Sequence, residues 1–398
     1  MNEAFDFTGF KACMDGLLEE YKIPGFDCIV YKKHKPIFRY YAGFRDVEKG
    51  IKLDGSELYM IFSMTKMLTC AAALQLFERG VFSLDDELSW YLSEFGKMKI
   101  ASDGLCAESD AGIMTGASFG DDTGTTGIGY AKNPIRIVDL FTMSAGLDYN
   151  IREECVKNAL AEGKTGTLDV VRAMSGKTLC FEPGSRFKYS LCHDVLGALI
   201  EVWSGQKLGE YMSDNIFRPL GMSDTFFGVP RDRLPVDRFA VRYDRDEKGN
   251  LLRVPLKNAY VVSEDYQSGG AGLVSRTDDY AVFLDALACG GMGWNGNRIL
   301  NEDTVKLWKT NRLSGIALED FHKLRKGYGY GLGVRTHMEP DVSGSMSPVG
   351  EFGWDGAAGA FSMVDTENEL SFTYFQHCHN WEVEMQSKMR NALYMSLK

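Results

Sequence analysis

The sequence of 398 residues lacks a long apolar run, an excess of positive charge and any closely spaced pair of cysteines. No segment approaches the run of about 18 apolar residues that a membrane-spanning helix requires, so we expect no membrane partner. The net charge is −11. Because an acidic protein repels phosphate backbones, we also expect no nucleic-acid partner.

The nine cysteines are scattered along the chain and odd in number. In a chain of this length, that pattern favours reduced thiols in a reducing compartment over a disulfide framework. The first ten residues, MNEAFDFTGF, include acidic side chains and lack the apolar core of a signal peptide. These features together predict a cytoplasmic protein.

The order of strand and helix patterns predicts the domain organisation. Strand-like segments lie near both ends, at 27–31 and 36–43 and again at 328–336, 359–365 and 370–377, whereas helical patterns dominate the middle. This order predicts a sheet domain built from residues 1–62 and 260–398, with a mainly helical domain of residues 63–259 inserted into it.

Residues 102–133 differ from their surroundings. They are rich in Gly, Thr, Ser and Asp and contain few large apolar side chains. A loop of about 30 residues is unusual inside a compact domain and is usually functional or mobile. We therefore expect a flexible loop at 102–133 that lies near the functional site.

The motif that carries chemistry is S-x-x-K at Ser63-Met64-Thr65-Lys66. Ser63 follows an apolar run at 59–62 and stands at the start of a helix predicted over 64–78. A residue three positions along a helix lies on the same face, so Lys66 can reach the Ser63 hydroxyl. The free amides at this helix end also favour a developing oxyanion. The pattern predicts a serine nucleophile with a lysine partner.

Other short patterns fail the test of context. Two more S-x-x-K matches begin at Ser185, in a Pro-Gly loop, and at Ser204, at a predicted helix end. His377 and His379 flank Cys378, but a third metal ligand is not evident beside them. We therefore expect neither a metal nor an organic cofactor.

Five ordered blocks between residues 135 and 273 resemble the serine β-lactamase and penicillin-binding-protein superfamily, in its class C-like branch. The block at 135–147 is similar to the branch's hLLtHtSGL segment, and Phe181-Glu182-Pro183-Gly184 with Phe187-Lys188-Tyr189-Ser190 is similar to its F.PG..f.YS block. The remaining blocks lie at 194–197, 219–222 and 269–273. This resemblance implies an α+β fold, with an antiparallel sheet flanked by helices and an inserted all-helical domain.

The resemblance also implies roles for individual residues. Ser63 is expected to be the nucleophile and Lys66 its partner, with Tyr189 as the tyrosine of the second motif. The third motif falls on Trp354-Asp355-Gly356, which is expected to bind substrate. The backbone amides of Ser63 and Ala357 are expected to form the oxyanion hole. Asp194 is expected to cap a helix or to support the site from behind.

Two departures indicate which branch the chain resembles most. The second motif reads Tyr189-Ser190-Leu191, where β-lactamases and DD-peptidases prefer Y-x-N, and Trp354 replaces the cation of the third motif. Both features resemble the family VIII carboxylesterases. Asp355 is expected to add repulsion against a substrate carboxylate.

The resemblance therefore implies a serine hydrolase that acts through an acyl-enzyme on a small-molecule ester or amide. We expect hydrolysis of carboxylic esters or acyl transfer, without a cofactor. The alternatives are a β-lactamase or D-Ala-type peptidase and, from another class, a catalytically silent scaffold or binding protein. Since free lysine and tyrosine have pKa values of about 10, either Lys66 or Tyr189 must have its pKa lowered to act as the base. The order of proton transfer and the oligomeric state stay open.

Overall fold

The computed structural model describes residues 5–101, 128–228, 236–379 and 383–398. Most of the predicted 102–133 loop therefore lies outside the described residues. Its last part is not a loop: β6 (Ile128–Tyr130) pairs antiparallel with β5 (Lys99–Ala101), so the loop prediction is wrong at this end. In the described residues, no helix is long and apolar enough to cross a membrane.

The main structural element is an antiparallel sheet with the strand order β12-β13-β14-β15-β16-β1-β2-β3. The two ends of the chain meet where β1 pairs with β16, in a register that runs from Asp27 opposite Phe375 to Lys32 opposite Leu370. The strands are β1 (Gly25–Lys32), β2 (Lys35–Asp46), β3 (Ile51–Lys52), β12 (Tyr328–Tyr330), β13 (Arg335–His337), β14 (Phe352–Gly353), β15 (Phe361–Asp365) and β16 (Leu370–Phe375). The predicted antiparallel sheet is confirmed.

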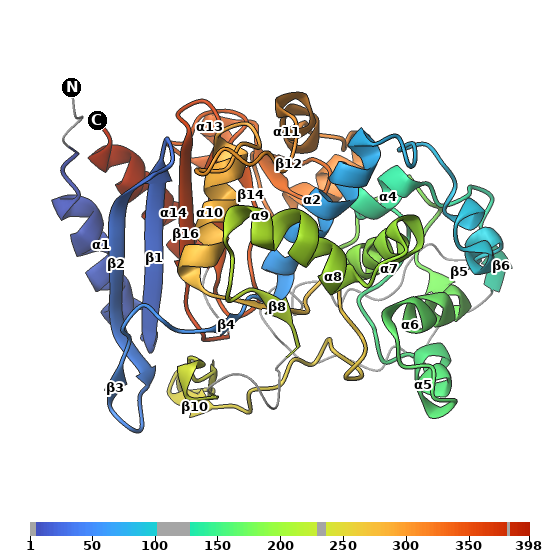
Figure 1. The fold of residues 1–398 in the computed structure, drawn as a ribbon, viewed down its shortest axis with the longest axis horizontal. Coiled ribbons are helices and arrows are strands. Elements are labelled where there is room, and N and C mark those ends of the chain that lie inside the picture. The colour runs from blue at the N-terminus through green and yellow to red at the C-terminus, as the bar shows by residue number, and fades with distance from the viewer. Residues whose placement is uncertain (1–4, 102–127, 229–235, 380–382) are drawn as a thin grey trace.

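Helices cover both faces of this sheet (Figure 1). Side chains of β1 alternate between the faces, and Phe26, Cys28 and Val30 are buried against α1 (Thr8–Glu20) and α14 (Glu384–Ser396). The opposite face packs against α10 (Thr277–Ala288), which contacts β1, β15 and β16. With both faces covered, β1, β15 and β16 are buried along almost their whole length.

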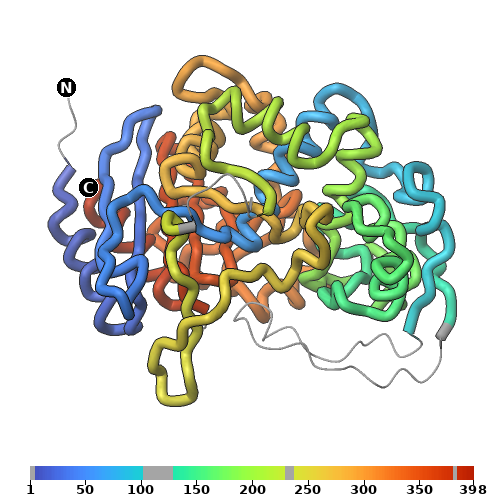
Figure 2. The backbone as a smooth tube through the Cα atoms, turned by 60° about the horizontal axis from the view of Figure 1, so that its bottom comes forward, coloured from blue at the N-terminus to red at the C-terminus, as the bar shows by residue number. Residues whose placement is uncertain are grey.

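The helical part of the chain surrounds α2 (Thr65–Glu78), which packs against α7 (Cys192–Ser204). Figure 2 shows these helices at one side of the molecule, with the strands from both chain ends at the other. The remaining helices are α4 (Ile137–Phe141), α5 (Glu154–Ala161), α6 (Thr167–Ala173), α8 (Leu208–Met212), α9 (Arg218–Leu220), α11 (Glu302–Lys309), α12 (Gly315–His322) and α13 (Pro340–Ser343).

Three smaller sheets complete the fold. One of them has the order β4-β11-β8 and leads directly into the predicted nucleophile. Its strands are β4 (Tyr59–Met60), β11 (Leu273–Ser275) and β8 (Phe226–Phe227). The other two join β5 and β6 with β7 (Thr178–Leu179), and β9 (Tyr243–Arg245) with β10 (Leu251–Arg253).

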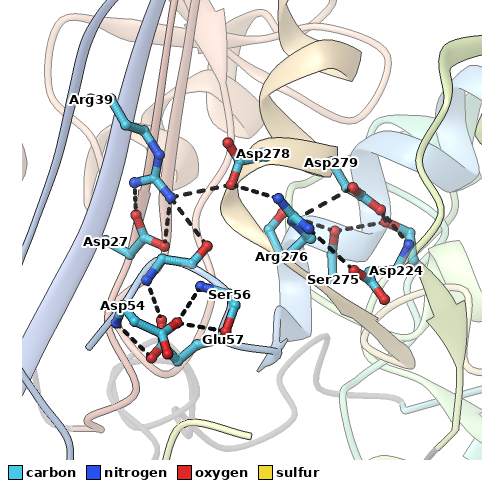
Figure 3. A network of polar contacts seen from close by, with 12 residues as sticks. Asp27, Arg39, Asp54, Ser56, Glu57, Asp224, Ser275, Arg276, Asp278 and Asp279 are labelled. Atoms are coloured by element: carbon cyan, nitrogen blue, oxygen red, sulfur yellow. Dashed lines mark hydrogen bonds and ion pairs between the residues drawn. The ribbon is translucent and has the colours of Figure 1, made fainter. Parts of the chain in front are cut away.

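Charged side chains tie the large sheet to α10 and to the small sheet (Figure 3). Arg39 of β2 pairs with Asp27 of β1 and, at 3.2 Å, with Asp278 of α10. Arg276 then joins Asp278 at 3.1 Å to Asp224 at 3.3 Å, just before β8. The network therefore fixes the helix and both sheets relative to one another.

Several local predictions differ from the structure. Residues 328–336 form two strands, because the chain turns at Gly333, which has a φ of 98°. Within the block at 135–147, only Ile137–Phe141 form a helix, and Met143 lies in the left-handed region at φ 57°. The helices α11 and α12 were not anticipated. Of the eight cysteines among the described residues, seven are free thiols and Cys180 is disulfide-bonded, so the expectation of reduced thiols does not hold for Cys180.

Candidate active site

Ser63 lies in a tight turn between β4 and α2. A short 3₁₀ segment, Phe62–Met64, joins the strand to the helix, and Phe62 adopts a φ of 45°. A left-handed conformation is costly for a bulky residue and is typical of functional sites. Phe62 and Met64 are buried, whereas Ser63 is half-buried. The turn therefore presents the serine hydroxyl while both neighbours anchor it in the core.

Lys66 lies one turn further along and is fully buried. Its Nζ is 3.3 Å from the Ser63 Oγ, 2.9 Å from the Tyr149 hydroxyl and 2.7 Å from the Gly270 carbonyl oxygen. None of these three partners is a carboxylate. Burial therefore dominates and lowers the pKa of Lys66 to about 7, although the charge of Asp194 opposes the shift.

A glycine-rich loop at 268–272 forms the cradle for the lysine. Asp194 holds it by accepting hydrogen bonds from Tyr266 Oη at 2.8 Å and Ser268 Oγ at 2.6 Å. A Cβ on Gly270 would lie 2.4 Å from the Asp194 Oδ2, so only glycine fits there. Asp194 is thus buried beneath the loop that supplies the carbonyl for Lys66, and it is not the cap of α7, whose N-cap residue is Leu191.

Tyr189 and Trp354, predicted from separate motifs, lie in contact. The Trp354 Nε1 donates a hydrogen bond to the Tyr189 hydroxyl over 3.1 Å, and the two ring centroids are 5.5 Å apart. The Lys66 Nζ lies 4.6 Å from the centroid of the Tyr189 ring. Ser190 takes no part in this contact, since its hydroxyl is directed at the sulfur atoms of Cys192 and Met143.

Tyr149 is a site residue that the sequence analysis missed. It lies two residues beyond the matched block at 135–147, its ring stacks on Tyr189 with centroids 5.2 Å apart, and its hydroxyl contacts both Lys66 and Ser63. Its loop is held by Lys177, which binds Asp148 at 2.7 Å. The sequence pointed to Tyr149 only through its position just after this block, because Tyr149 and Lys66 are 83 residues apart in the chain.

Burial favours the neutral form of all three titratable groups around Ser63, which is the deprotonated form of lysine and the protonated form of tyrosine. Burial disfavours the charged form of each group, so it lowers the pKa of a lysine and raises that of a tyrosine. The pKa of Tyr189 is raised by burial, and hydrogen bonds with Ser63 and Trp354 offset only part of this effect. The pKa of Tyr149 is also raised well above its usual value by burial. Near neutral pH, Lys66 is therefore the group that can accept a proton.

The third motif places its three residues differently. The Trp354 ring faces Tyr189, whereas the Asp355 carboxylate is buried and pairs with Arg325 at 2.5 Å and Arg335 at 3.3 Å. The expectation that Asp355 binds or repels substrate is not supported, because its charge is taken up by these arginines. Gly356 allows a close approach, since a Cβ there would lie 2.6 Å from the Ile61 carbonyl oxygen.

Among the described residues, two backbone amides next to the nucleophile turn are left without a hydrogen-bond acceptor. In the described part of the chain, the amides of Ser63 and Ala357 donate no hydrogen bond. Ala357 packs in one small apolar cluster with Phe62, directly beside Ser63. The Gly356 amide, by contrast, donates to the Ala360 carbonyl at 2.8 Å. The arrangement therefore fits a two-amide oxyanion hole.

Comparisons with known proteins give the family and the fold of the chain. A family model described as Beta-lactamase matches residues 10–394. Esterase EstB of Burkholderia gladioli is 26% identical over 380 residues, covering 90% of this chain and 87% of the relative. A putative D-alanyl-D-alanine carboxypeptidase of Escherichia coli is 26% identical over 360 residues, covering 86% and 74%. Among solved structures, EstCE1, a hydrolase with promiscuous acyltransferase activity, has the same fold, with a TM-score of 0.76, 21% identity and 97% coverage of each chain.

Proposed function

This chain belongs to the beta-lactamase family, and from that premise we propose that it hydrolyses carboxylic esters through an acyl-enzyme on Ser63. The observation that carries the proposal is the position of Lys66. A fully buried amine with a pKa of about 7 lies 3.3 Å from the Ser63 hydroxyl. A serine hydroxyl is a weak nucleophile until a base takes its proton, and this amine is placed to do so.

Acylation follows from the positions of these groups. Neutral Lys66 accepts the Ser63 proton, directly or through the Tyr149 hydroxyl, as the Oγ bonds to the ester carbonyl carbon. The carbonyl oxygen becomes an oxyanion and receives hydrogen bonds from the Ser63 and Ala357 amides. When the tetrahedral intermediate collapses, the C–O bond to the alcohol breaks. The alkoxide takes the proton back from Lys66 and leaves as alcohol.

Deacylation repeats these steps with water. Lys66, neutral again, accepts a proton from water while the water oxygen attacks the acyl carbon. The bond to the Ser63 Oγ breaks, and Ser63 recovers its proton as the acid is released. An alcohol that takes the place of water would give acyl transfer by the same steps, so hydrolysis and transfer share one intermediate.

The preference for neutral esters rests on the third motif. Penicillins and D-Ala-D-Ala peptides carry a carboxylate near the scissile bond, and burying it without a partner costs several kcal/mol. Here Trp354 stands where such enzymes have a cation, and the arginines that touch the motif, Arg325 and Arg335, are committed to Asp355. The rings of Trp354, Tyr189 and Tyr149 offer an apolar wall instead.

Covalent labelling tests the nucleophile. A fluorophosphonate should add its mass to the peptide that carries Ser63, and Ser63→Ala should abolish both labelling and ester hydrolysis. Ser185→Ala is the matched control, because Ser185 also begins an S-x-x-K match but lies in a loop. Absence of labelling in folded protein would instead favour a catalytically silent scaffold.

A substrate panel tests the specificity. We expect kcat/KM for p-nitrophenyl butyrate to exceed that for a chromogenic cephalosporin by at least about tenfold, which corresponds to about 1.4 kcal/mol in transition-state binding. A D-Ala-D-Ala peptide should be the poorest substrate. If the cephalosporin is turned over more efficiently than the ester, the alternative of a β-lactamase takes the place of the esterase.

A further inference from the structure

Three potential metal ligands of different chemistry meet on the side of α10 that faces the β1–β2 turn. The ligand atoms of His34, Asp285 and Cys289 all lie within 4.8 Å of one another. From this cluster we propose a second site in the protein, which binds a divalent metal ion of the zinc type through the imidazole, the carboxylate and the thiolate.

Two elements bring the ligands together. Asp285 and Cys289 are four residues apart at the end of α10, so their side chains share one face of the helix. His34 lies in the two-residue turn between β1 and β2, where Lys33 and His34 adopt φ values of 50° and 63°. The His34 amide donates to Asp285 Oδ1 over 3.1 Å, which fixes the turn against the helix.

The distances are close to those of an occupied site. The His34 Nδ1 is 2.7 Å from the Asp285 Oδ2, and the Cys289 Sγ is 4.0 Å from the Asp285 Oδ1. Bonds of about 2.0–2.3 Å to a tetrahedral zinc ion place donor atoms about 3.3–3.6 Å apart. The observed separations lie on either side of that range, so small side-chain movements would suffice.

The chemistry and accessibility of the ligands also suit such an ion. Imidazole nitrogen, carboxylate oxygen and cysteine sulfur are the three kinds of protein ligand that zinc accepts. Asp285 is fully buried, while His34 and Cys289 are half-buried, so an ion can enter from solvent and keep water as a fourth ligand. Lys33, on the same turn, pairs with Glu369 at 3.6 Å.

The site would act on stability and not on the reaction itself. The ion would join the β1–β2 turn to the C-terminal end of α10. Further back on the same helix, the Tyr280 hydroxyl donates to the Met64 carbonyl at 2.8 Å, directly behind the nucleophile turn. An ion bound at His34, Asp285 and Cys289 would therefore brace the helix that supports this turn.

Metal titration of the full chain tests the proposal. Protein stripped with EDTA should take up one equivalent of Zn²⁺ in competition with a chromogenic chelator, and Co²⁺ should give a near-ultraviolet thiolate charge-transfer band. Both His34→Gln and Cys289→Ser should weaken Zn²⁺ binding at least about tenfold, and Cys289→Ser should remove the band. Cys155→Ser, which alters another half-buried free thiol, should change neither.

A second measurement uses the wild-type chain alone, so its result does not depend on whether the variants fold. In the wild-type chain, saturating Zn²⁺ should slow alkylation of Cys289 by iodoacetamide, measured by peptide mass, while Cys155 reacts at an unchanged rate. Equal Zn²⁺ affinity in wild type and both ligand variants, or no protection of Cys289, would overturn the proposal. The three residues would then form only a hydrogen-bonded clamp between turn and helix.

Discussion

Two lysines with no exposed surface, Lys66 and Lys177, have opposite electrostatic environments in the same protein. Lys66 contacts two hydroxyls and a carbonyl, and its pKa is lowered to about 7. Lys177 binds Asp148 at 2.7 Å and also pairs with Glu153, and its pKa is raised, since these charges outweigh its burial. Burial therefore does not decide the charge of a lysine; the presence of a carboxylate partner does.

This contrast indicates that the two lysines have different roles in the protein. Lys177 holds the 148–153 loop that carries Tyr149, and so contributes to the site through structure. Lys66 is kept without a carboxylate partner at hydrogen-bond distance, which costs stability but yields an amine that can gain and lose a proton near neutral pH. Each prediction below tests one side of this comparison.

The largest expected effect is on activity and concerns Lys66. Lys66→Arg keeps the positive charge but cannot release a proton, so kcat/KM for an ester should fall by at least about a thousandfold. Lys177→Arg, a matched change at the paired lysine, should retain most activity. Steady-state kinetics with p-nitrophenyl butyrate measure both, and near-normal turnover by Lys66→Arg would contradict the assignment of the base.

The effect on stability should be larger at Lys177 than at Lys66, which is the reverse of the effect on activity. Lys177→Met leaves Asp148 and Glu153 without their cation and should lower the free energy of unfolding by about 2–4 kcal/mol. Lys66→Met removes a desolvated amine that lacks a charged partner, and should change stability little or increase it. Urea denaturation followed by circular dichroism compares the two. A larger loss in Lys66→Met would mean that its neutral hydrogen bonds matter more than its desolvation.

An intermediate effect is expected from the hydroxyl that bridges Lys66 and Ser63. Tyr149→Phe keeps the stacked ring but removes this contact, so kcat should fall by about 10- to 100-fold with little change in KM. Tyr189→Phe provides the comparison, because the Tyr189 hydroxyl also hydrogen-bonds with Ser63 but has Trp354 as its other partner where Tyr149 has Lys66. If Tyr149→Phe retains full activity while Tyr189→Phe does not, proton transfer bypasses Tyr149.

The smallest effect concerns the pH profile. Because the neutral form of Lys66 is the base, kcat/KM should fall as pH decreases through about 7 and level off above it. The negative charge of Asp194 raises the pKa of Lys66, so the isosteric Asp194→Asn should lower that pKa and move the midpoint to more acidic pH. A midpoint that moves to higher pH, or does not move, would show that Asp194 acts only by holding the 268–272 loop.

Much of the site could be anticipated where it depends on local patterns. Ser63 and Lys66 are one helical turn apart, so their proximity follows from helix geometry once the helix is recognised. Tyr189 and Trp354 were found because each belongs to a short motif with a characteristic order of residues. The structure brings these four together, although their motifs span almost 300 residues of sequence.

Other features could not be read in this way, because they depend on partners distant in the chain. Asp355 seemed to face the substrate, but pairing with Arg325 and Arg335 directs its carboxylate into the interior. The ligand cluster was missed because His34 and Asp285 are 251 residues apart, and the expectation of no metal considered only closely spaced residues. The helices α11 and α12 were also missed, since both are short.

By itself, the sequence determined the fold class and the order of the motifs and predicted Ser63 as the nucleophile with Lys66 as its partner, because the resemblance rests on short blocks in a fixed order and the two residues are one helical turn apart. The tertiary structure alone showed that burial lowers the pKa of Lys66 and raises those of Tyr149 and Tyr189, that the Tyr149 hydroxyl contacts Lys66, and that the Asp355 carboxylate pairs with two arginines. The physical reason is that a pKa and a side-chain direction are set by desolvation and by charges in space, and the residues that provide them lie far apart along the chain.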